Sequence, residues 1–376
     1  MKVLHLLASG GIGGIETLCS NYSKYTKNNN TFLIIWGKDS ETYRQIKKSG
    51  GKVIQLNASK RRPLQILIKI EKIRRKGGFD IVVIHHEITL CYLYLIFLKK
   101  IQKSQIHTII YSHCNANDML RTQTSRGLSF RKKVLKAALQ ATDGIIAISQ
   151  SVKKSLIEVF GVPQNKIQVI YNGVDLKCYQ DLKKNRENNG SRKKDQFTAP
   201  VKLVYVGRLI QEKGVQNTLN ALANVSTKMQ WNFDVIGDGP YRSKLEQLAD
   251  NLGINEKVHF LGERKDVPNL LKDYDIFIHM PIWEEGFGIT IIEAMATGLL
   301  CICRAKGGIP EIIEDGKNGI LVNSNKMLKN VLEELIPIFN SKKIIMIRNN
   351  GTTKALEYSI EMYSNQLDDF LQSMKC

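Results

Sequence analysis

The feature that most constrains the fold is the alternation of short apolar segments with amphipathic helical patterns along the chain. Four- to seven-residue apolar runs bounded by glycine or polar residues predict buried strands. The predicted strands are 3–8, 31–36, 52–56, 80–85, 107–112, 144–149 and 167–171, then 201–207, 231–237, 258–262, 275–280, 299–304 and 319–322. The predicted helices are 15–25, 63–77, 214–226, 240–252, 288–297 and 353–374. This alternation favours parallel sheets covered by helices, an α/β fold.

One polar segment interrupts the alternation and divides the chain. Residues 177–200 are charged, contain few apolar positions and end in a proline, which is typical of an exposed linker. A length of 376 residues also favours two domains over one. We therefore expect a first domain over 1–176, the linker, a second domain over 201–352, and a C-terminal helix within 353–376 that packs back on the first domain.

The positive charge lies almost entirely in the first half of the chain. Residues 1–178 carry 29 Lys and Arg against 10 Asp and Glu, whereas the remainder carries 26 against 25. A one-sided basic half predicts an anionic partner such as acidic lipid, nucleic acid or a polyanionic substrate. Nucleic acid is disfavoured because no basic platform interleaved with aromatic residues is present. The basic half is therefore expected to face an anionic membrane surface.

Cellular location is constrained by three further features. The seven cysteines are scattered, odd in number and without zinc-ligand spacing, which favours a reducing compartment. The longest apolar run, 88–98, is too short to cross a bilayer as a helix. The N-terminal run is interrupted by glycines and does not match a signal peptide. We expect a cytoplasmic protein that is soluble or peripheral on the inner face of the plasma membrane.

The first candidate binding motif is the glycine cluster GGIGGIE, residues 10–16, between a predicted strand and a helix. Glycines there let the backbone approach a ligand, and the helix N-terminus favours an anion. The cluster is not the dinucleotide fingerprint, because Glu16 stands where the last glycine would be, and a dinucleotide oxidoreductase is disfavoured. A tight turn without a ligand remains the alternative.

The second motif is VGRLIQEKG, residues 206–214. Arg208 and Lys213 follow the carboxyl end of the first strand of the second half, where open α/β sheets bind ligands. Two cations at this position suit a diphosphate. The planar guanidinium of Arg can donate two hydrogen bonds to a phosphate, and the ammonium of Lys attracts it as a compact charge. Taken alone, the pair is better explained as two solvated surface charges, which is the usual state of Lys and Arg.

The third motif is EGFGITIIE, residues 285–293. Its glycines predict a turn from a strand into a helix whose free amides can meet an anion. Glu285 then lies in the loop and Glu293 in the helix. A pair of carboxylates can accept hydrogen bonds from several sugar hydroxyls at once. The alternative is that one glutamate caps the helix and the other is simply exposed. This alternative explains the spacing and the two glycines of the motif less well.

Together these motifs resemble those of the retaining glycosyltransferases of family four. The resemblance extends over almost the whole chain, through AISQSVKKSL and GVPQNKIQVIYNGVD (147–175), VIGDGP (235–240), VHFLGERKDV (258–267) and GGIPEIIEDGKNGILV (307–322). It implies the GT-B architecture. In this architecture two Rossmann-like doubly wound domains face a cleft, and the C-terminal helix packs back on the first.

The resemblance also implies a role for individual residues. Arg208 and Lys213 would hold the donor diphosphate, and Glu293 would bind the ribose hydroxyls. Glu285, with the amides of Phe287, Gly288 and Ile289, would interact with the donor sugar and the phosphates. The remaining implied residues are Gly13 and Gly14 near the diphosphate, His113 near the transferred sugar, and Arg264 at the base.

The implied reaction moves a sugar with retained configuration from a nucleoside-diphosphate sugar to a glycan or lipid-linked acceptor. No cofactor or metal is implied, and a UDP-sugar is favoured over a GDP-sugar as donor. The implied pathway is a bacterial surface polysaccharide, lipopolysaccharide or capsule. Two alternatives remain, a sugar-nucleotide epimerase and a non-catalytic glycan-binding relative.

Two further clusters are interpreted as structural. Asp273-Tyr274-Asp275 resembles an aspartate pair that could hold a metal, but it ends a helix and opens a strand, and hard cations prefer more converging oxygens. His85-His86-Glu87 follows a strand and offers too few ligands for zinc. We interpret it as a loop facing the cleft, with acceptor contact as an alternative.

Overall fold

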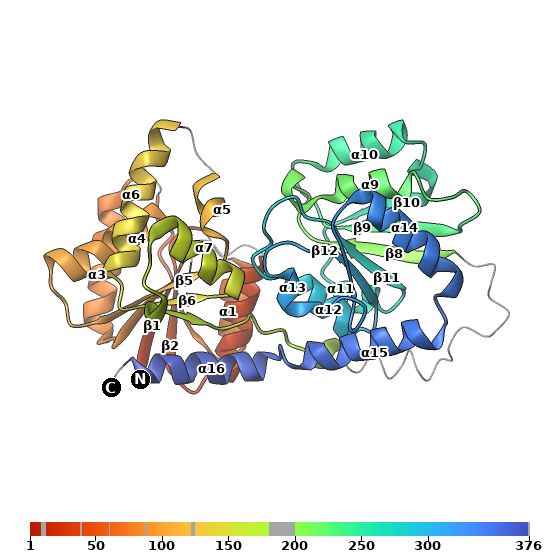
Figure 1. Cartoon of the computed structure of the whole chain (residues 1–376). Helices are drawn as coiled ribbons and strands as arrows, with labels where there is room; N and C mark the ends of the chain where they lie inside the picture. Colours follow the sequence, from red (N-terminus) through yellow and green to blue (C-terminus); the bar gives the residue numbers. More distant parts are fainter. Residues whose placement is uncertain are drawn as a thin grey trace. The chain divides into compact units, whose positions relative to one another are not determined.

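The computed structural model describes residues 1–8, 13–37, 40–59, 61–85, 88–121, 125–179 and 200–374, without the side chains of residues 120–128. The chain divides into two compact units. Unit 1 comprises Met1–Val174 and Ile360–Cys376, and unit 2 comprises Asp175–Ser359. Each unit is a parallel sheet covered by helices (Figure 1). The predicted α/β fold with two Rossmann-like doubly wound sheets is confirmed.

Unit 1 contains a seven-stranded sheet in the order β3-β2-β1-β4-β5-β6-β7. Its strands are β1 Lys2–Leu7, β2 Asn29–Ile34, β3 Lys52–Gln55, β4 Ile81–Ile84, β5 His107–Ser112, β6 Gly144–Ala147 and β7 Ile167–Val169. The order reverses between β1 and β4, which pair in parallel. Open α/β sheets bind ligands beyond the carboxyl ends of the strands at such a reversal.

Unit 2 contains a six-stranded sheet in the order β10-β9-β8-β11-β12-β13. Its strands are β8 Val201–Val206, β9 Trp231–Ile236, β10 Val258–Gly262, β11 Ile276–His279, β12 Leu300–Arg304 and β13 Ile320–Val322. Here the order reverses between β8 and β11, which are also parallel. The loops that follow these two strands contain VGRLIQEKG and EGFGITIIE.

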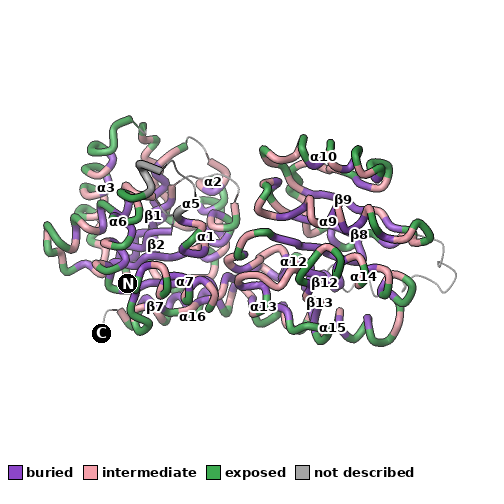
Figure 2. The backbone as a smooth tube through the Cα atoms, turned by 45° about the horizontal axis from the view of Figure 1, so that its top comes forward, coloured by how far each residue is buried: buried purple, intermediate pink, exposed green. Residues whose placement is uncertain are grey.

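The central strands are buried on both faces, which explains why they read as continuous apolar runs rather than alternating ones. All four residues of β4 and of β11 are buried. The strands form the buried interior of each unit in the tube view (Figure 2). Each of the thirteen predicted strands is present, within a few residues of its expected bounds.

Helices cover the sheets. In unit 1 they are α1 Gly14–Tyr25, α2 Glu41–Lys48, α3 Pro63–Gly77, α4 Thr89–Ile96 with the π-helix Phe97–Ile101, α5 Ala116–Arg121, α6 Ser125–Ala141, α7 Gln150–Phe160 and α16 Ile360–Ser373. In unit 2 they are α9 Val215–Leu222, α10 Arg242–Asn251, α11 Val267–Leu271, α12 Ile289–Ala296, α13 Ile309–Ile312, α14 Asn325–Leu335 and α15 Lys342–Leu356. Short 3₁₀ turns are Gln164–Lys166, Gln211–Lys213, Asn255–Lys257 and Ile336–Ile338.

The predicted helix 353–374 is instead two helices. α15 begins earlier, at Lys342, and ends at Leu356, and α16 begins at Ile360. Tertiary contacts override the amphipathic pattern between them. The hydroxyl of Tyr358 donates to the carbonyl of Glu311 in unit 2, whereas the Ile360 N–H donates to the carbonyl of Val174 in unit 1. The predicted packing of a C-terminal helix on the first domain is confirmed by α16.

The start of the predicted exposed linker also differs from expectation. Tyr179 is only 4% exposed and belongs to unit 2. Residues 180–199, the rest of that predicted segment, lie outside the described residues. Within the described residues, every helix is too short or too polar to cross a membrane.

Candidate functional site

The loop after β8 presents two cations in different settings. The Arg208 side chain is exposed, while the next residue, Leu209, is buried and fixes the loop to the core. Gly214, at φ +73°, ends the 3₁₀ turn that carries Lys213. A Cβ atom at Gly214 would lie 1.8 Å from the carbonyl oxygen of Met280, so only glycine lets this loop reach the end of β11.

Lys213 and Glu285 form an ion pair at that junction. The Lys213 Nζ lies 2.7 Å from the Glu285 Oε2, and both side chains are largely buried. His279, the last residue of β11, is also hydrogen-bonded to the same oxygen at 3.0 Å. Burial favours the neutral acid, but the Lys213 charge and the hydrogen bond to His279 outweigh it and hold the pKa of Glu285 well below its usual range. Glu285 is therefore a carboxylate at neutral pH.

A second loop holds the backbone of the Glu285 segment in place. The N–H of Gly308 donates to the Glu285 carbonyl at 2.7 Å. A Cβ atom at Gly307 would lie 2.1 Å from that carbonyl oxygen, so this close approach requires glycine. The GGIPE motif at 307–311 thus has a structural role: it supports the loop that carries Glu285.

The turn after Glu285 leads into α12 as predicted. Gly288 caps this helix at φ +110°, and Phe287 is buried with its ring edge against Tyr358. In the first turn the Ile291 N–H donates to the carbonyl of the capping Gly288, and the N-terminus of α12 is electropositive. The amides of Phe287, Gly288 and Ile289 are thus grouped at a helix start that suits an anion.

Glu293 lies one turn into α12 and contacts a residue that the sequence did not suggest. Burial raises the pKa of Glu293 to about 7, while a hydrogen bond to Tyr179 opposes that rise. Burial and the nearby Glu293 charge together raise the pKa of Tyr179 above its usual value. The carboxyl group of Glu293 is therefore poised between its two protonation states at neutral pH.

Arg264, predicted to touch the base, is exposed in the loop after β10. Its guanidinium forms two hydrogen bonds to the Asp266 carboxylate, at 2.9 and 2.8 Å. The pair orders the side chain in the free protein. Contact with a base stays a prediction.

In unit 1, the described part of the glycine cluster begins at Gly13, because residues 10–12 lie outside the described residues. Gly13 is the N-cap of α1, and Gly14 is its first residue. A Cβ atom at Gly13 would lie 2.5 Å from the Oε2 of Glu16, a buried residue. Glu16, which breaks the dinucleotide fingerprint, thus packs back against the turn.

His113 follows β5 and is partly exposed. Its ring stacks on Tyr111 with centroids 4.3 Å apart, and its Nε2 lies 3.3 Å from the Nδ1 of His85. The expectation that His85 belongs to a cleft-facing loop is wrong, since His85 is 1% exposed. His86 and Glu87 lie outside the described residues.

The aspartates of the Asp273-Tyr274-Asp275 motif precede β11, at the amino-terminal end of the central strands, whereas Arg208 follows the carboxyl end of β8. The Asp275 carboxylate accepts the backbone N–H of Lys202 at the start of β8, and the Tyr274 hydroxyl donates to Asp234. In the described part of the chain, no group of three or more His, Cys, Asp or Glu side chains could hold a metal ion.

Sequence reasoning missed two residues of this site, His279 and Tyr179. A signal existed for His279, because it is the one polar side chain in the apolar run IFIHM, residues 276–280, at the end of a predicted strand. Tyr179 gave none, since it was assigned to a polar segment.

The two parallel α/β units, each with a reversal of strand order, define a protein with the GT-B fold. Residues 12–177 match the model of Glycosyltransferase Family 4, and residues 184–365 match that of Glycosyl transferases group 1. The chain belongs to this family of retaining glycosyltransferases, which transfer a sugar from a nucleoside-diphosphate sugar.

Several relatives are similar over much of the chain. N-acetyl-alpha-D-glucosaminyl L-malate synthase of Bacillus anthracis is 27% identical over 69% of this chain and 65% of its own length. An uncharacterized 41.2 kDa protein in the cps region of Klebsiella pneumoniae is 26% identical over 91% and 92%. The crystal structure of Anabaena HepE in complex with UDP-glucose is 23% identical over 99% of this chain and 100% of its own, with a TM-score of 0.81.

Proposed function

We propose that this protein transfers a hexosyl group from a UDP-sugar, with retained configuration, to a glycan or lipid-linked acceptor in bacterial surface-polysaccharide synthesis. The observation that carries the donor assignment is the cluster at the β8–β11 reversal. There an exposed Arg208 lies on the same loop as Lys213, which is fixed by the Glu285 carboxylate. The uridine nucleotide is supported by the UDP-glucose bound in the related Anabaena structure, and the polysaccharide role by the Klebsiella relative.

In the proposed reaction the bond between the sugar carbon and the phosphate oxygen breaks, and a bond to the acceptor oxygen forms on the same face. The leaving diphosphate gains negative charge and takes the acceptor proton. Arg208, Lys213 and the first amides of α12 stabilise that charge, which other enzymes stabilise with a metal. Chelator is therefore expected to leave activity unchanged.

Other residues of the proposed site have narrower roles. Glu293 accepts hydrogen bonds from the ribose hydroxyls, Glu285 interacts with the donor sugar, and Arg264 contacts the base. Unit 1 contributes Gly13 and Gly14 toward the diphosphate and His113 toward the transferred sugar.

Thermal-shift measurements of wild type and Arg208→Ala against UDP, GDP, ADP and their sugar conjugates test the donor assignment. A ligand that binds only the native state raises its apparent stability, by about 2.7 kcal/mol at a hundredfold excess over Kd. We expect UDP to stabilise the wild type and Arg44→Ala, a control in which an exposed arginine of unit 1 is removed. Arg208→Ala should lose the shift. No shift with any nucleotide at millimolar concentration would overturn the assignment.

The acceptor proposal rests on an exposed surface of unit 1, here called the α3 surface. Leu64 and Ile68 are 73% and 67% exposed and lie one turn apart on α3. The exposed cations on and before this helix are Arg61, Arg62, Lys69, Lys72, Arg75 and Lys76. Each basic residue near anionic lipid contributes about 1 kcal/mol, and exposed apolar side chains add insertion energy. This combination supports docking on the inner face of the plasma membrane.

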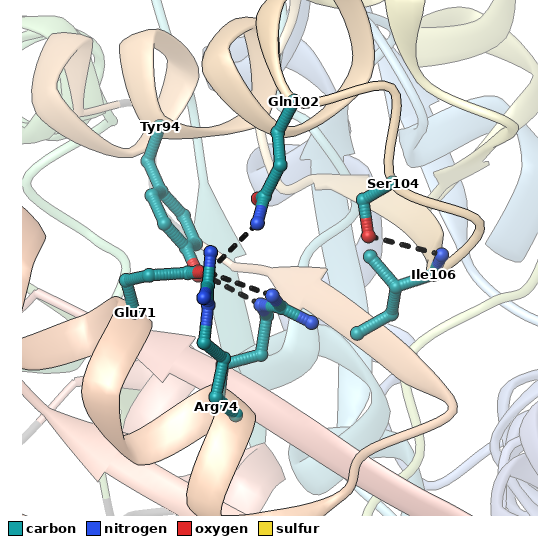
Figure 3. A network of polar contacts seen from close by, with 7 residues as sticks. Glu71, Arg74, Tyr94, Gln102, Ser104 and Ile106 are labelled. Atoms are coloured by element: carbon teal, nitrogen blue, oxygen red, sulfur yellow. Dashed lines mark hydrogen bonds and ion pairs between the residues drawn. The ribbon is translucent and has the colours of Figure 1, made fainter.

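A polar network holds α3 against the helix beside it. The Glu71 carboxylate accepts from Arg74 at 2.7 and 2.8 Å, from Tyr94 of α4 at 2.8 Å, and from Gln102 at 3.2 Å (Figure 3). Although burial opposes ionisation, these donors lower the pKa of Glu71 to about 2. Glu71, the only acidic residue of α3, also pairs with the exposed Arg75, so Lys69, Lys72 and Lys76 are the cations that leave the exposed face of the helix positively charged.

A small soluble acceptor is the second candidate, because the Bacillus anthracis relative is named N-acetyl-alpha-D-glucosaminyl L-malate synthase. Binding to anionic vesicles distinguishes the two. Sedimentation with vesicles containing phosphatidylglycerol at low salt, lost at high salt, supports a lipid-linked acceptor, and absence of binding at any salt supports a soluble one. Release of nucleoside diphosphate only when acceptor is present excludes the epimerase.

A further inference from the structure

His279 is a buried histidine that shares one carboxylate oxygen with Lys213. It is the last residue of β11 and is 2% exposed. Its Nε2 lies 3.0 Å from the Glu285 Oε2, and the Lys213 Nζ lies 2.7 Å from the same oxygen. A strand and two different loops of unit 2 therefore converge on this oxygen. The proposed function uses Glu285 and Lys213 but leaves the histidine without a role.

The position of the proton on His279 follows from its surroundings. Glu285 is a carboxylate and can only accept, so the His279 Nε2 must bear a proton and donate it. The His279 Nδ1 is buried and has no hydrogen-bond partner within the described residues. A second proton there would be a buried donor without an acceptor, which is unfavourable. Burial and the Lys213 charge accordingly lower the pKa of His279, although Glu285 acts to raise it. His279 is thus a neutral ring that donates only through Nε2.

The His279 ring is held rigidly because it belongs to a central strand. β11 lies between β8 and β12 in the sheet, and its register pairs His279 with Cys303. The ring of Tyr205, from β8, stacks with the His279 ring with centroids 5.8 Å apart, and the Phe277 ring centre is 6.4 Å away. Close packing of this kind restricts changes of rotamer. Since Lys213 and Glu285 both lie in loops, His279 is the fixed member of the cluster.

Glu285 is consequently held at two points. Its backbone carbonyl accepts the Gly308 N–H at 2.7 Å, and its Oε2 accepts from both His279 and Lys213. Among the described residues, none forms a hydrogen bond or an ion pair with the other oxygen, Oε1, and 11% of the side chain is exposed. Two donors on one oxygen therefore leave the second oxygen as the acceptor for a ligand.

Lys213 and His279 differ in how they respond to a bound donor. In the proposed function the Lys213 ammonium also binds the diphosphate, which competes with Glu285 for its three N–H groups. His279 is uncharged, buried and fixed in the sheet, so the phosphates do not draw it away from Glu285. The hydrogen bond from His279 is therefore the contact that keeps Oε2 in place when the donor is bound.

We propose that His279 is a positioning residue for recognition of the donor sugar: its hydrogen bond holds the Oε2 of Glu285 and leaves Oε1 to accept from a sugar hydroxyl. The inference rests on the proposed function, in which Glu285 interacts with that sugar. His279 is buried and acts only through Glu285. Substitution of His279 is therefore expected to weaken recognition of the sugar and to leave recognition of the nucleotide unchanged.

Titration calorimetry with UDP and with UDP-glucose separates these two contacts. We expect His279→Leu to raise the Kd for UDP-glucose about tenfold and to leave the Kd for UDP within about twofold, because UDP has no sugar to meet Oε1. His279→Gln should bind both ligands as wild type does, since its amide nitrogen is as many bonds from Cβ as the ring Nε2 and also donates. The matched control is His259→Leu, which removes the other histidine of unit 2, paired with Asp234, and should change neither Kd.

A double-mutant cycle distinguishes positioning from a general loss of structure. Glu285→Ala removes the whole sugar contact, so adding His279→Leu to it should weaken UDP-glucose binding no further. Additive losses overturn the inference, as does an equal loss of UDP binding in His279→Leu. Wild-type binding of UDP-glucose by His279→Leu, when Glu285→Ala is impaired, also overturns it and leaves the proposed function intact. If Glu285→Ala itself binds UDP-glucose normally, Glu285 does not meet the sugar, and the proposed role of Glu285 is wrong together with the inference.

The hydrogen bond from His279 can also be tested in the free protein. In wild type labelled with ¹⁵N-histidine, long-range ¹H–¹⁵N correlation distinguishes a ring nitrogen that bears a proton from one that has a lone pair. The His279 signals are identified by their absence from the spectrum of His279→Gln. At neutral pH we expect a proton on Nε2 and a lone pair on Nδ1. A ring whose Nε2 bears no proton does not donate to Glu285, and this result overturns the inference whatever the nucleotide binds.

Discussion

At the residue scale, Arg208 and Lys213 differ in what surrounds them. Arg208 is exposed, whereas Lys213 compensates the largely buried carboxylate of Glu285 and lies with its Nζ 5.3 Å from the Trp283 ring centre. Removing one partner of a buried pair leaves an uncompensated charge, which costs about 3 kcal/mol. We expect Lys213→Ala to lose both donor binding and stability in urea unfolding, and Arg208→Ala to lose binding with stability within about 0.5 kcal/mol of wild type. Equal stability of the two variants would contradict this assignment.

Glu293 predicts a pH dependence of donor binding. Burial raises its pKa to about 7 in the free protein, so the protonated form is populated at neutral pH and must lose its proton before the carboxylate can accept from two ribose hydroxyls. Because those donors favour the charged form, binding should release a proton, and affinity should rise between pH 6 and pH 8. Calorimetry of UDP binding in buffers of different ionisation enthalpy measures the release. Glu293→Gln controls for titration of the nucleotide itself and should release fewer protons.

His5 predicts a pH dependence of folding stability, because burial lowers its pKa. Its pKa is about 4 when folded and 6.5 when unfolded, so the unfolded chain binds more protons between these values. Stability is therefore complete above pH 6.5 and is lost as pH falls toward 4, by about 3 kcal/mol from this group. Urea unfolding at pH 7 and pH 4.5 should give a smaller difference for His5→Phe than for wild type. An identical difference in the two proteins contradicts the prediction.

Motif spacing predicted Arg208, Lys213, Glu285 and the glycine turn at 286–288, because these residues are contiguous or lie on loops after adjacent strands. It could not predict that His279 shares the Glu285 oxygen or that Tyr179 meets Glu293. Those contacts join segments that only the tertiary fold brings together. The same limitation applies to His85, whose neighbours in space come from two other strands.

At the element scale, the α3 surface predicts a membrane phenotype that is separable from catalysis. Leu64→Ser with Ile68→Ser removes two exposed apolar side chains and leaves the Glu71 network intact, so folding should be unaffected. We expect binding to phosphatidylglycerol vesicles to fall severalfold, with unchanged turnover on a water-soluble acceptor analogue. The matched control is Ile345→Ser with Met346→Ser on α15, which are 44% and 56% exposed in unit 2. Equal losses in both pairs would show that general hydrophobicity, rather than α3, binds the vesicles.

Among the elements, strands were easier to predict than helices. All thirteen strands gave short apolar runs, because a parallel sheet buries both faces. The helix 63–77 was predicted with its true bounds, since Pro63 begins it and Gly78 ends it in the left-handed conformation at φ +59°. α15 and α16 were merged because one amphipathic pattern continues through both. Their separation depends on the Tyr358 and Ile360 contacts, which no local pattern encodes.

At the scale of the whole molecule, Asp368 anchors α16 in unit 1. Its carboxylate accepts hydrogen bonds from four donors in α1 and the loop after it, namely the hydroxyls of Tyr22 and Thr26, the Lys27 N–H and the Asn28 amide. Loss of the carboxylate leaves several of these donors buried without a partner, and each such donor costs about 1–3 kcal/mol. We expect Asp368→Ala to lower the stability of the protein by at least about 2 kcal/mol in chemical unfolding. Asp369→Ala, the adjacent exposed carboxylate, should be neutral. If both variants unfold alike, the anchor does not lie at Asp368.

The anchor also has a consequence for the order of events during synthesis. Residues 360–374 complete the first unit, yet a ribosome translates all of residues 175–359 before it reaches them. During that interval α1 and the Thr26–Asn30 segment lack the carboxylate that they enclose. The second unit, whose segments are contiguous in the chain, can finish folding first. Unit 1, although most of it is translated first, can therefore be completed only after all of unit 2 has been translated.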